Sequence, residues 1–367
     1  MNPQLKSFSV IMATFNSERT IEAALRAIRN QDYPQDRVEI LVVDGGSTDA
    51  TREIAARYEC RIIDNPRVDP VNAKLIGLRE AKGDYLMHVD SDEILIRRDT
   101  LKKRLAAFRS ASNIVMVFGS GYLNPPGACF AARYINEYGD PFSLFYYRLS
   151  KDHRFFIPAM RRHLALVRES SEFIVFKVGK GKQPIMENAA CGNCIDLHFF
   201  RTRLREICDK PWGPVHFFYH MQRFTDEFAV TRDDPIIHES AEHWTSLLRK
   251  IKSRVRNNIF FPDMAASGFQ GRSQFDTSFR RWRRFLYLPY AFLVVPVLID
   301  AFRLAWTRRD PAYMLHVPLT LYTAGLIVAM AVLKTMGYRP RRRSYGEHKV
   351  IEGEGHLSAT SVNGESA

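Results

Sequence analysis

The chain has 367 residues, which is enough for one large domain with an appendage or for two modest domains. Hydrophobic residues make up 46% and charged residues 25%, a balance that excludes a chain disordered along its whole length. Five scattered cysteines do not form a disulfide framework and indicate a reducing compartment.

The first hundred residues alternate between strand and helix patterns. Strands are predicted at 8–13, 38–43, 61–63 and 85–89, and helices at 17–30, from near 48, and at 72–82. Strands alternating with helices of this length predict an α/β fold with a mostly parallel sheet covered on both faces. Ligands of such sheets bind beyond the carboxyl ends of the strands. Thr14, Asp44 and Asp90 each follow directly on a strand, so we expect one site to collect all three.

The middle of the chain, from about residue 100 to 240, has a mixed pattern. The stretch at 122–149 is rich in aromatic residues, glycine and proline, which indicates irregular structure. Two interpretations stay open for it: an acceptor-side surface, or an ordinary loop-rich subdomain.

Positive charge is concentrated after residue 240. Between Glu242 and Arg284 ten Lys and Arg residues stand against three acidic residues. This density beside an apolar region indicates contact with anionic lipid head groups. Nucleic acid is the other partner that such charge suits, but no nucleic-acid-binding motif accompanies it, so we expect none. The stretch 245–258 predicts a basic amphipathic helix, either in a membrane interface or solvated on the domain.

Two apolar segments follow. Phe285–Ile299 is uncharged over 15 residues and contains Pro289 and Pro296, while Pro311–Leu333 is uncharged over 23 residues and is long enough to span a bilayer. Arginine clusters flank the pair on both outer sides, which predicts a hairpin with both clusters in the cytosol. A buried helical hairpin in a soluble domain is the alternative. We therefore expect a catalytic domain at 1–240, a basic juxtamembrane region at 241–284, two membrane helices at 285–338, and a basic, then disordered, tail at 339–367.

The sharpest motif is Asp90-Ser91-Asp92 at the end of the fourth predicted strand. Two carboxylates spaced i, i+2 at a strand end can point into one cleft, and a hard divalent cation prefers oxygen ligands. A cation bound there would bridge a diphosphate and neutralise the charge that develops on it. Alone, the pattern also occurs in solvated turns. The preceding strands and helices favour the metal interpretation.

Four ordered motifs carry a resemblance to glycosyltransferase family 2, whose members share the GT-A fold. They are the stretches 9–16 (SVIMATFN), 42–49 (VVDGGSTD), Ala73-Lys74 with Gly77, and 83–92 (GDYLMHVDSD). The resemblance implies a GT-A catalytic domain that binds a nucleotide-sugar donor with Mn2+ or Mg2+ and inverts the anomeric centre. The nucleotide-sugar-binding residues that it implies are Ala13, Thr14, Phe15, Asn16, Asp44, Ser47, Lys74, Asp90 and Ser91.

The resemblance also implies that Asp92 and Asp90 hold the metal. His238, which ends the stretch Pro235-Ile236-Ile237-His238, resembles the histidine that completes the metal or diphosphate site in the family. Lys74 replaces the usual arginine and would contact the diphosphate as a point charge.

The acceptor side departs from the family pattern. His216-Phe217 stands where the family has a Glu-Asp pair, so the expected base is missing. Two catalytic candidates remain: His216, since imidazole is a competent base near neutral pH, and Asp209 after a loop shift. A purely structural role for His216 stays open.

The expected function is the inverting, metal-dependent transfer of one sugar to a lipid-linked glycan or polyprenyl acceptor, such as a polyprenyl-diphosphate glycan or polyprenyl phosphate. We expect it to act in cell-envelope polysaccharide or glycolipid biosynthesis at the cytoplasmic membrane, with the catalytic domain facing the cytosol. The motif of processive polysaccharide synthases is absent. One alternative is a membrane-bound relative that binds nucleotide sugar without transferring it. A nucleotidyltransferase or a dinucleotide-binding oxidoreductase would need a glycine-rich loop after the first strand, and Ala13-Thr14-Phe15-Asn16 has no glycine.

Overall fold

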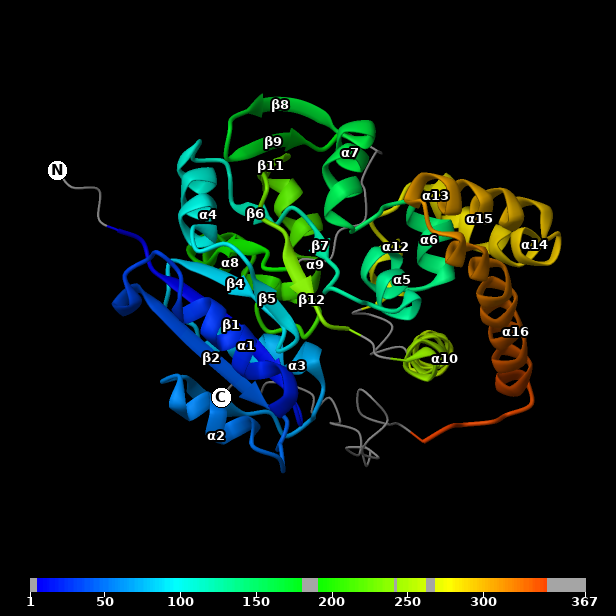
Figure 1. Ribbon diagram of the computed structural model, residues 1–367, viewed down its shortest axis with the longest axis horizontal. Coiled ribbons are helices and arrows are strands. Elements are labelled where there is room, and N and C mark those ends of the chain that lie inside the picture. The colour runs from blue at the N-terminus through cyan, green and yellow to red at the C-terminus, as the bar shows by residue number, and fades with distance from the viewer. Residues whose placement is uncertain (1–4, 180–190, 241–242, 262–267, 342–367) are drawn as a thin grey trace, which may run out of the picture.

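The computed structural model describes residues 5–179, 191–240, 243–261 and 268–341. Its centre is a nine-stranded sheet of order β3-β2-β1-β4-β10-β6-β11-β9-β8, beside a small sheet of order β5-β12-β7 (Figure 1). The strands of the large sheet are β1 (Phe8–Thr14), β2 (Val38–Asp44), β3 (Arg61–Asp64), β4 (Tyr85–His88), β6 (Met116–Phe118), β8 (Ala165–Glu169), β9 (Phe173–Lys177), β10 (Cys194–Asp196) and β11 (Glu227–Thr231). The strands of the small sheet are β5 (Glu93–Leu95), β7 (Tyr122–Leu123) and β12 (Ile236–His238).

The α/β prediction is confirmed, with one correction. Strands β1 to β4 pair in parallel as expected, but β10 runs antiparallel to both β4 and β6, and β9 and β8 add further antiparallel pairs. The sheet is therefore mixed, not mostly parallel. The antiparallel strands come from the part of the chain whose sequence pattern is irregular.

Side chains of β1 alternate between the two faces of the sheet, which explains the two large apolar cores. Ile11 packs in the core beneath α3 (Pro70–Glu80), α8 (Leu197–Arg203) and α9 (Gly213–His220). Val10 and Met12 pack in the core beneath α1 (Glu18–Arg29), α2 (Thr51–Arg57) and α4 (Thr100–Arg109). The period-two pattern of this strand therefore fixes which helices cover which face.

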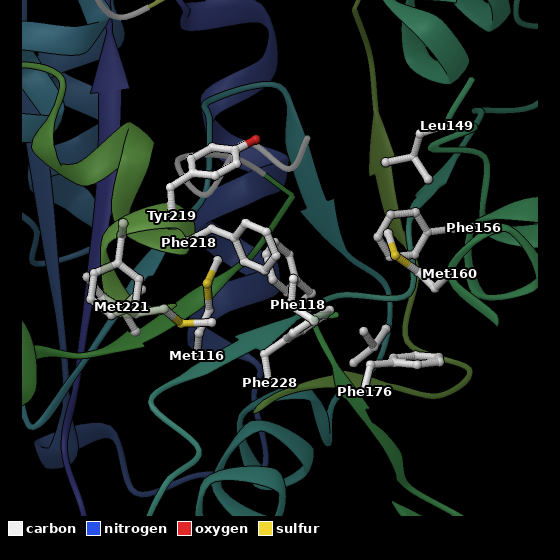
Figure 2. Packing of buried hydrophobic residues seen from close by; sticks show 14 of the residues in the cluster. Met116, Phe118, Leu149, Phe156, Met160, Phe176, Phe218, Tyr219, Met221 and Phe228 are labelled. Atoms are coloured by element: carbon white, nitrogen blue, oxygen red, sulfur yellow. The ribbon is translucent and has the colours of Figure 1, made fainter. Parts of the chain in front are cut away.

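Aromatic side chains fill the centre of the first core. Phe118 lies edge-on to Phe218 and Phe228, with ring centroids 5.8 and 5.3 Å away (Figure 2). Such edge-to-face pairs add to the stabilisation from apolar burial. They join the neighbouring strands β6 and β11 to helix α9.

The remaining helices form a layer beside the sheet (Figure 1). They are α5 (Phe130–Tyr138), α6 (Pro141–Tyr147), α7 (His153–His163), α10 (Trp244–Phe260), α12 (Phe269–Ser273), α13 (Ser278–Arg283), α14 (Tyr287–Phe292), α15 (Val295–Arg308) and α16 (His316–Thr335). A third apolar core joins α5 and α6 to α10, α15 and α16. Four ion pairs of 2.6 to 2.8 Å connect residues before position 240 with residues after it: Arg133–Asp310, Arg148–Asp300, Arg254–Asp140 and Arg308–Glu137. The expected domain boundary at residue 240 is thus crossed by apolar packing and by charge.

The two apolar segments differ in shape. Pro311–Thr335 is the one unbroken helix within the described ranges that is long and apolar enough to cross a membrane. The first segment is bent by 89° between Phe292 and Val295, where Val294 adopts a positive φ of 60°. Pro296 then lies in the first turn of α15, the position at which proline is tolerated. The segment is therefore two helices and not one straight span.

Candidate active site

The donor half of the site begins where β1 and β2 end side by side. Thr14 pairs with Asp44 in the parallel register, and the Thr14 hydroxyl donates to the Asp44 carboxylate at 3.0 Å. Asp44 is fully buried, and it also accepts from the backbone N–H and the hydroxyl of Ser47, at 2.9 and 2.5 Å. Burial alone would raise the pKa of Asp44, but these donors outweigh it and hold the pKa below its usual value. Asp44 is an ionised acceptor at the floor of the site.

Asn16 closes this corner. It adopts a positive φ of 49°, a region that asparagine tolerates better than most residues. Its N–H donates to the Ser47 hydroxyl at 2.8 Å, and its side-chain oxygen accepts from the Thr48 N–H at 2.9 Å. Ala13 lies directly before Thr14 on β1. Phe15 lies against Gly45, so closely that a Cβ atom added at Gly45 would be 3.2 Å from the Phe15 ring. The structure thus brings the predicted base- and ribose-binding residues of β1 and β2 together.

The second part of the donor site is the turn after β4. Lys74 extends from α3 to Asp90, with its ammonium nitrogen 3.0 Å from the carboxylate. Ser91 donates its hydroxyl to that of Ser17 at 3.0 Å, which links this turn to the start of α1. Ser17 is the N-cap residue of α1 but makes no side-chain cap, since its hydroxyl is directed to neighbouring groups instead. Lys74, predicted to contact the diphosphate, and Asp90, predicted to reach the ribose or the metal, are therefore in contact.

Asp92 faces β12. The Nε2 atom of His238 lies 3.4 Å from its carboxylate, and the Glu239 N–H donates to the Asp92 carbonyl at 2.9 Å. Burial would raise the pKa of Asp92, but His238 and Lys250 outweigh burial and lower it. The residues predicted to hold a metal, Asp90, Asp92 and His238, converge on one turn.

These three side chains do not form a preassembled metal cage. Within the described residues no group of three or more His, Cys, Asp or Glu is arranged to hold a metal ion. Asp90 is directed to Lys74, so Asp92 and His238 are the pair that faces one space. One carboxylate and one imidazole would leave further coordination positions on a cation, and the oxygens of a substrate diphosphate can fill such positions, as substrate phosphates do for Mg2+.

Glu93 is the site residue to which our sequence analysis assigned no role. It is fully buried, and it accepts from the Tyr122 hydroxyl at 2.6 Å, from the Cys191 N–H at 2.9 Å and from the Asp90 N–H at 3.1 Å. Burial and the nearby Asp90 charge raise the pKa of Glu93 to about 7. Glu93 thereby ties two distant segments, at Tyr122 and at Cys191, to the turn that carries Asp90 and Asp92. Its place directly after the Asp-x-Asp motif is the one sequence signal for this role.

The turn before β12 is fixed by a buried ion pair. Arg104 and Asp234 are both buried and lie 2.6 Å apart, and Asp234 also accepts from the Thr100 hydroxyl at 2.5 Å. An arginine and a carboxylate that are both desolvated hold their geometry tightly, because breaking the pair leaves an uncompensated charge. This cluster sets where β12 begins and, with it, the position of His238.

The structure does not bring the two predicted bases to the site. His216 is fully buried in the first core among the rings of Trp212, Tyr219 and Phe275, with centroids 6.0 to 6.2 Å away. Its ring neighbours belong to the apolar core and not to the turn that carries Asp90 and Asp92, so the structure gives no support to the prediction that His216 acts as a base. Helix α9 carries apolar residues on all sides, which hid the burial of this position.

Asp209 is likewise remote from the donor site. Its carboxylate, 80% exposed, pairs with Arg79 at 3.0 Å, near the end of α3. Lys74, which pairs with Asp90, lies in the first half of the same helix. Asp209 is therefore on the surface near the other end of α3, and the prediction that it replaces the missing base is not supported.

Comparisons with known proteins agree with the motifs. Residues 9–161 match the family model described as glycosyl transferase family 2. A poly(ribitol-phosphate) beta-N-acetylglucosaminyltransferase, TarS of Staphylococcus aureus, is 33% identical over 108 residues, which cover 28% of this chain and 19% of that protein. A GalNAc(5)-diNAcBac-PP-undecaprenol beta-1,3-glucosyltransferase of Campylobacter jejuni is 30% identical over 99 residues, or 25% of this chain and 31% of that protein.

Among solved structures, that of S. aureus TarS residues 1–349 superposes with a TM-score of 0.47 at 14% identity, covering 97% of this chain and all of that one. The chain thus matches less than a third of the length of these two curated relatives.

Proposed function

From the premise that residues 9–161 are a glycosyl transferase family 2 domain, we propose that this glycosyltransferase moves one sugar from a nucleotide-sugar donor to a lipid-linked acceptor at the cytoplasmic membrane. The observation that carries the proposal is the convergence of Asp44, the Lys74–Asp90 pair and the Asp92–His238 pair at the carboxyl ends of β1, β2 and β4. Each group suits one part of a nucleoside diphosphate.

The parts are assigned as follows. The ionised Asp44, held by Thr14 and Ser47, accepts N–H groups of the base. Lys74 offers positive charge to the diphosphate. Asp92 and His238 would hold Mn2+ or Mg2+ together with diphosphate oxygens, and the bound cation would neutralise the charge that grows on the leaving nucleoside diphosphate.

Transfer with inversion is a single displacement at the anomeric carbon, as the family resemblance implies. The protein's task is then to hold the donor with its leaving group on the Asp92 side and the acceptor on the opposite side of the sugar ring. Positioning of this kind accounts for a large part of enzymatic rate enhancement.

A lipid-linked acceptor is supported by the apolar helices that follow the domain and by the Campylobacter relative, whose printed name includes an undecaprenol-linked substrate. The α16 helix and the bent α14–α15 pair would anchor the protein, with the basic helix α10 beside the membrane surface. A cell-envelope glycan or glycolipid is the product class that follows.

The test is a panel of UDP, GDP and dTDP sugars offered to the purified full-length protein with Mn2+ or Mg2+. We expect one nucleotide class to raise the melting temperature only when metal is present, and the same nucleotide sugar to release nucleoside diphosphate when membrane lipid extract is added. Stabilisation without any release, over the whole panel and with lipid present, would indicate a protein that binds the donor without transferring it.

A further inference from the structure

A cavity of about 540 Å³ lies between the catalytic domain and the C-terminal helices. Its lining includes Tyr122 and Cys191, which both donate hydrogen bonds to Glu93, and also Leu288 and Ile327 of the apolar segments. This volume is within the usual range for a small-molecule site. The cavity thus connects residues beside the Asp-x-Asp turn with helices expected at the membrane.

The wall of the cavity is mainly apolar. Phe118, Leu149 and Phe156, seen in Figure 2 around the first core, line one part of it. Phe285 also lines it, yet 56% of that side chain is exposed, so the cavity opens at the apolar outer surface. A hydrocarbon chain could therefore enter sideways from a bilayer.

The charge in the cavity is positive. Four lining residues are basic, and one, Asp140, is acidic and pairs with Arg254 at 2.8 Å. The basic residues are Lys151, Arg254, Arg272 and Arg284. Cations among apolar walls fit a ligand that has both a long chain and a phosphate.

Among the basic residues that line the cavity, Lys151 is the one that lies against Tyr122. Its ammonium nitrogen lies 5.7 Å from the centre of the Tyr122 ring. The other neighbours of that ring are His238, with ring centroids 4.6 Å apart, and the Glu93 carboxylate. A phosphate held by Lys151 would thus lie next to the side chains that hold the metal.

We propose that the cavity binds a long-chain lipid monophosphate, with its chain among the C-terminal helices and its phosphate at Lys151, and that this phosphate is itself the sugar acceptor. The proposal rests on the proposed function and names its acceptor. In the reaction a phosphate oxygen forms a bond to the anomeric carbon, and the bond from that carbon to the diphosphate oxygen breaks. The nucleoside diphosphate leaves with the electron pair.

This acceptor explains why the family's base is missing. A hydroxyl acceptor must lose a proton, whereas a phosphate monoester is already ionised near neutral pH, with a second pKa of about 6. His216 and Asp209 lie away from the site, and Asp90, Asp92 and Glu93 are engaged with other groups. The reaction needs no base from the protein.

The test measures binding of undecaprenyl phosphate, undecaprenol and phosphatidylglycerol to the full-length protein in detergent. We expect undecaprenyl phosphate to bind at least about tenfold more tightly than the other two, since a charge-assisted hydrogen bond contributes about that much. Lys151→Met should remove the preference over undecaprenol, while Lys102→Met, at an exposed position on α4, should keep it. Equal binding of all three lipids by wild type would overturn the proposal.

Filling the cavity gives a second readout. Ile327→Trp should weaken undecaprenyl phosphate binding by about tenfold or more, and Val328→Trp, at a 39% exposed neighbour outside the cavity, should not. Equal loss in both variants would contradict the assignment.

Two further measurements, a transfer assay and a nucleotide titration, distinguish failure of this proposal from failure of the proposed function. Glu239→Gln, which removes the carboxylate of the residue after His238, should keep transfer to undecaprenyl phosphate, whereas loss of transfer would show that the reaction needs a base from the protein and would contradict the proposal. Calorimetric titration with UDP or GDP and Mn2+ is run on each sample. Lipid binding without nucleotide binding would refute the donor assignment alone, and nucleotide binding without lipid preference would refute the cavity assignment alone.

Discussion

Charged side chains at the site occur in pairs of opposite sign. Lys74 faces Asp90, and His238 faces Asp92, and the second pair keeps the pKa of Asp92 low in spite of burial. The Asp92 carboxylate is therefore ready to act as an anion before any ligand arrives. Removing one partner of such a partly buried pair costs more than removing an exposed charge, because the other charge stays behind.

We predict that Lys74→Met weakens binding of nucleoside diphosphate by about 10- to 100-fold, because the diphosphate would then meet Asp90 without a compensating cation. The control is Arg79→Met on the same helix, whose partner Asp209 is exposed. Calorimetric titration with Mn2+ present measures both. Equal affinities in wild type and Lys74→Met would show that Lys74 does not contact the diphosphate.

For His216 we expect a substitution to change the stability of the protein and not its turnover. Because its ring is buried among aromatic side chains, His216→Gln should lower the melting temperature while turnover per folded enzyme stays within about twofold of wild type. Loss of a true base would cost about 10² to 10⁴ in rate. Steady-state rates corrected for the folded fraction decide between the two.

At the scale of elements, the donor site depends on how closely α3 lies on β1. A Cβ atom at Gly77 would come within 2.5 Å of the Ile11 side chain, which is buried in the first core. Glycine is required here for close approach of the helix, and that approach brings Lys74 within reach of Asp90.

We predict that Gly77→Ala destabilises the protein by about 1 to 3 kcal/mol, because overpacking outweighs the gain in helix propensity. Gly325→Ala on α16, where an added Cβ meets no atom within 4 Å, should have no such cost. Chemical denaturation followed by circular dichroism measures both changes. If the two variants were equally stable, the tight contact between α3 and β1 would not exist in solution.

The elements that the sequence predicted well are those determined by local pattern. Strands β1 to β4 and helices α1 to α3 follow from short apolar runs and from helical periodicity, so Asp44 and Asp90 could be placed at strand ends. Glu93 could not be assigned, because its partners Tyr122 and Cys191 come from distant parts of the chain. Pro289 and Pro296 indicate a kink in the first apolar segment, but its 89° angle could not be predicted, because it depends on the positive φ of Val294, a conformation that valine rarely adopts.

At the scale of the whole molecule, exposed apolar side chains are concentrated on the C-terminal helices. All but five of the exposed large hydrophobic residues in the described chain lie between Trp282 and Tyr338. We call these exposed residues between Trp282 and Tyr338 the apolar belt. Within the belt, Phe302 is 65% exposed and Trp306 is 86% exposed. A contiguous apolar surface of this kind marks an interaction site, and the flanking arginines favour a membrane.

We predict that Phe302→Glu with Trp306→Glu reduces membrane association several-fold, because two charges would replace apolar groups at the lipid contact. Phe224→Glu, at a 49% exposed position on the catalytic domain, should leave association unchanged. Flotation with liposomes that contain phosphatidylglycerol measures this. Wild type that remains with the aqueous fraction without detergent would refute a membrane role for the belt.

The central claim is that Asp92, with His238, holds the cation that binds the donor's diphosphate. The most direct measurement is calorimetric titration of UDP or GDP, whichever binds wild type, into wild type and Asp92→Ala with and without Mn2+. Asp36→Ala, a 76% exposed aspartate, serves as the control. We expect Mn2+ to strengthen nucleotide binding at least about tenfold in wild type and in Asp36→Ala, and Asp92→Ala to abolish this gain. A nucleotide affinity that Mn2+ strengthens equally in Asp92→Ala would contradict this claim.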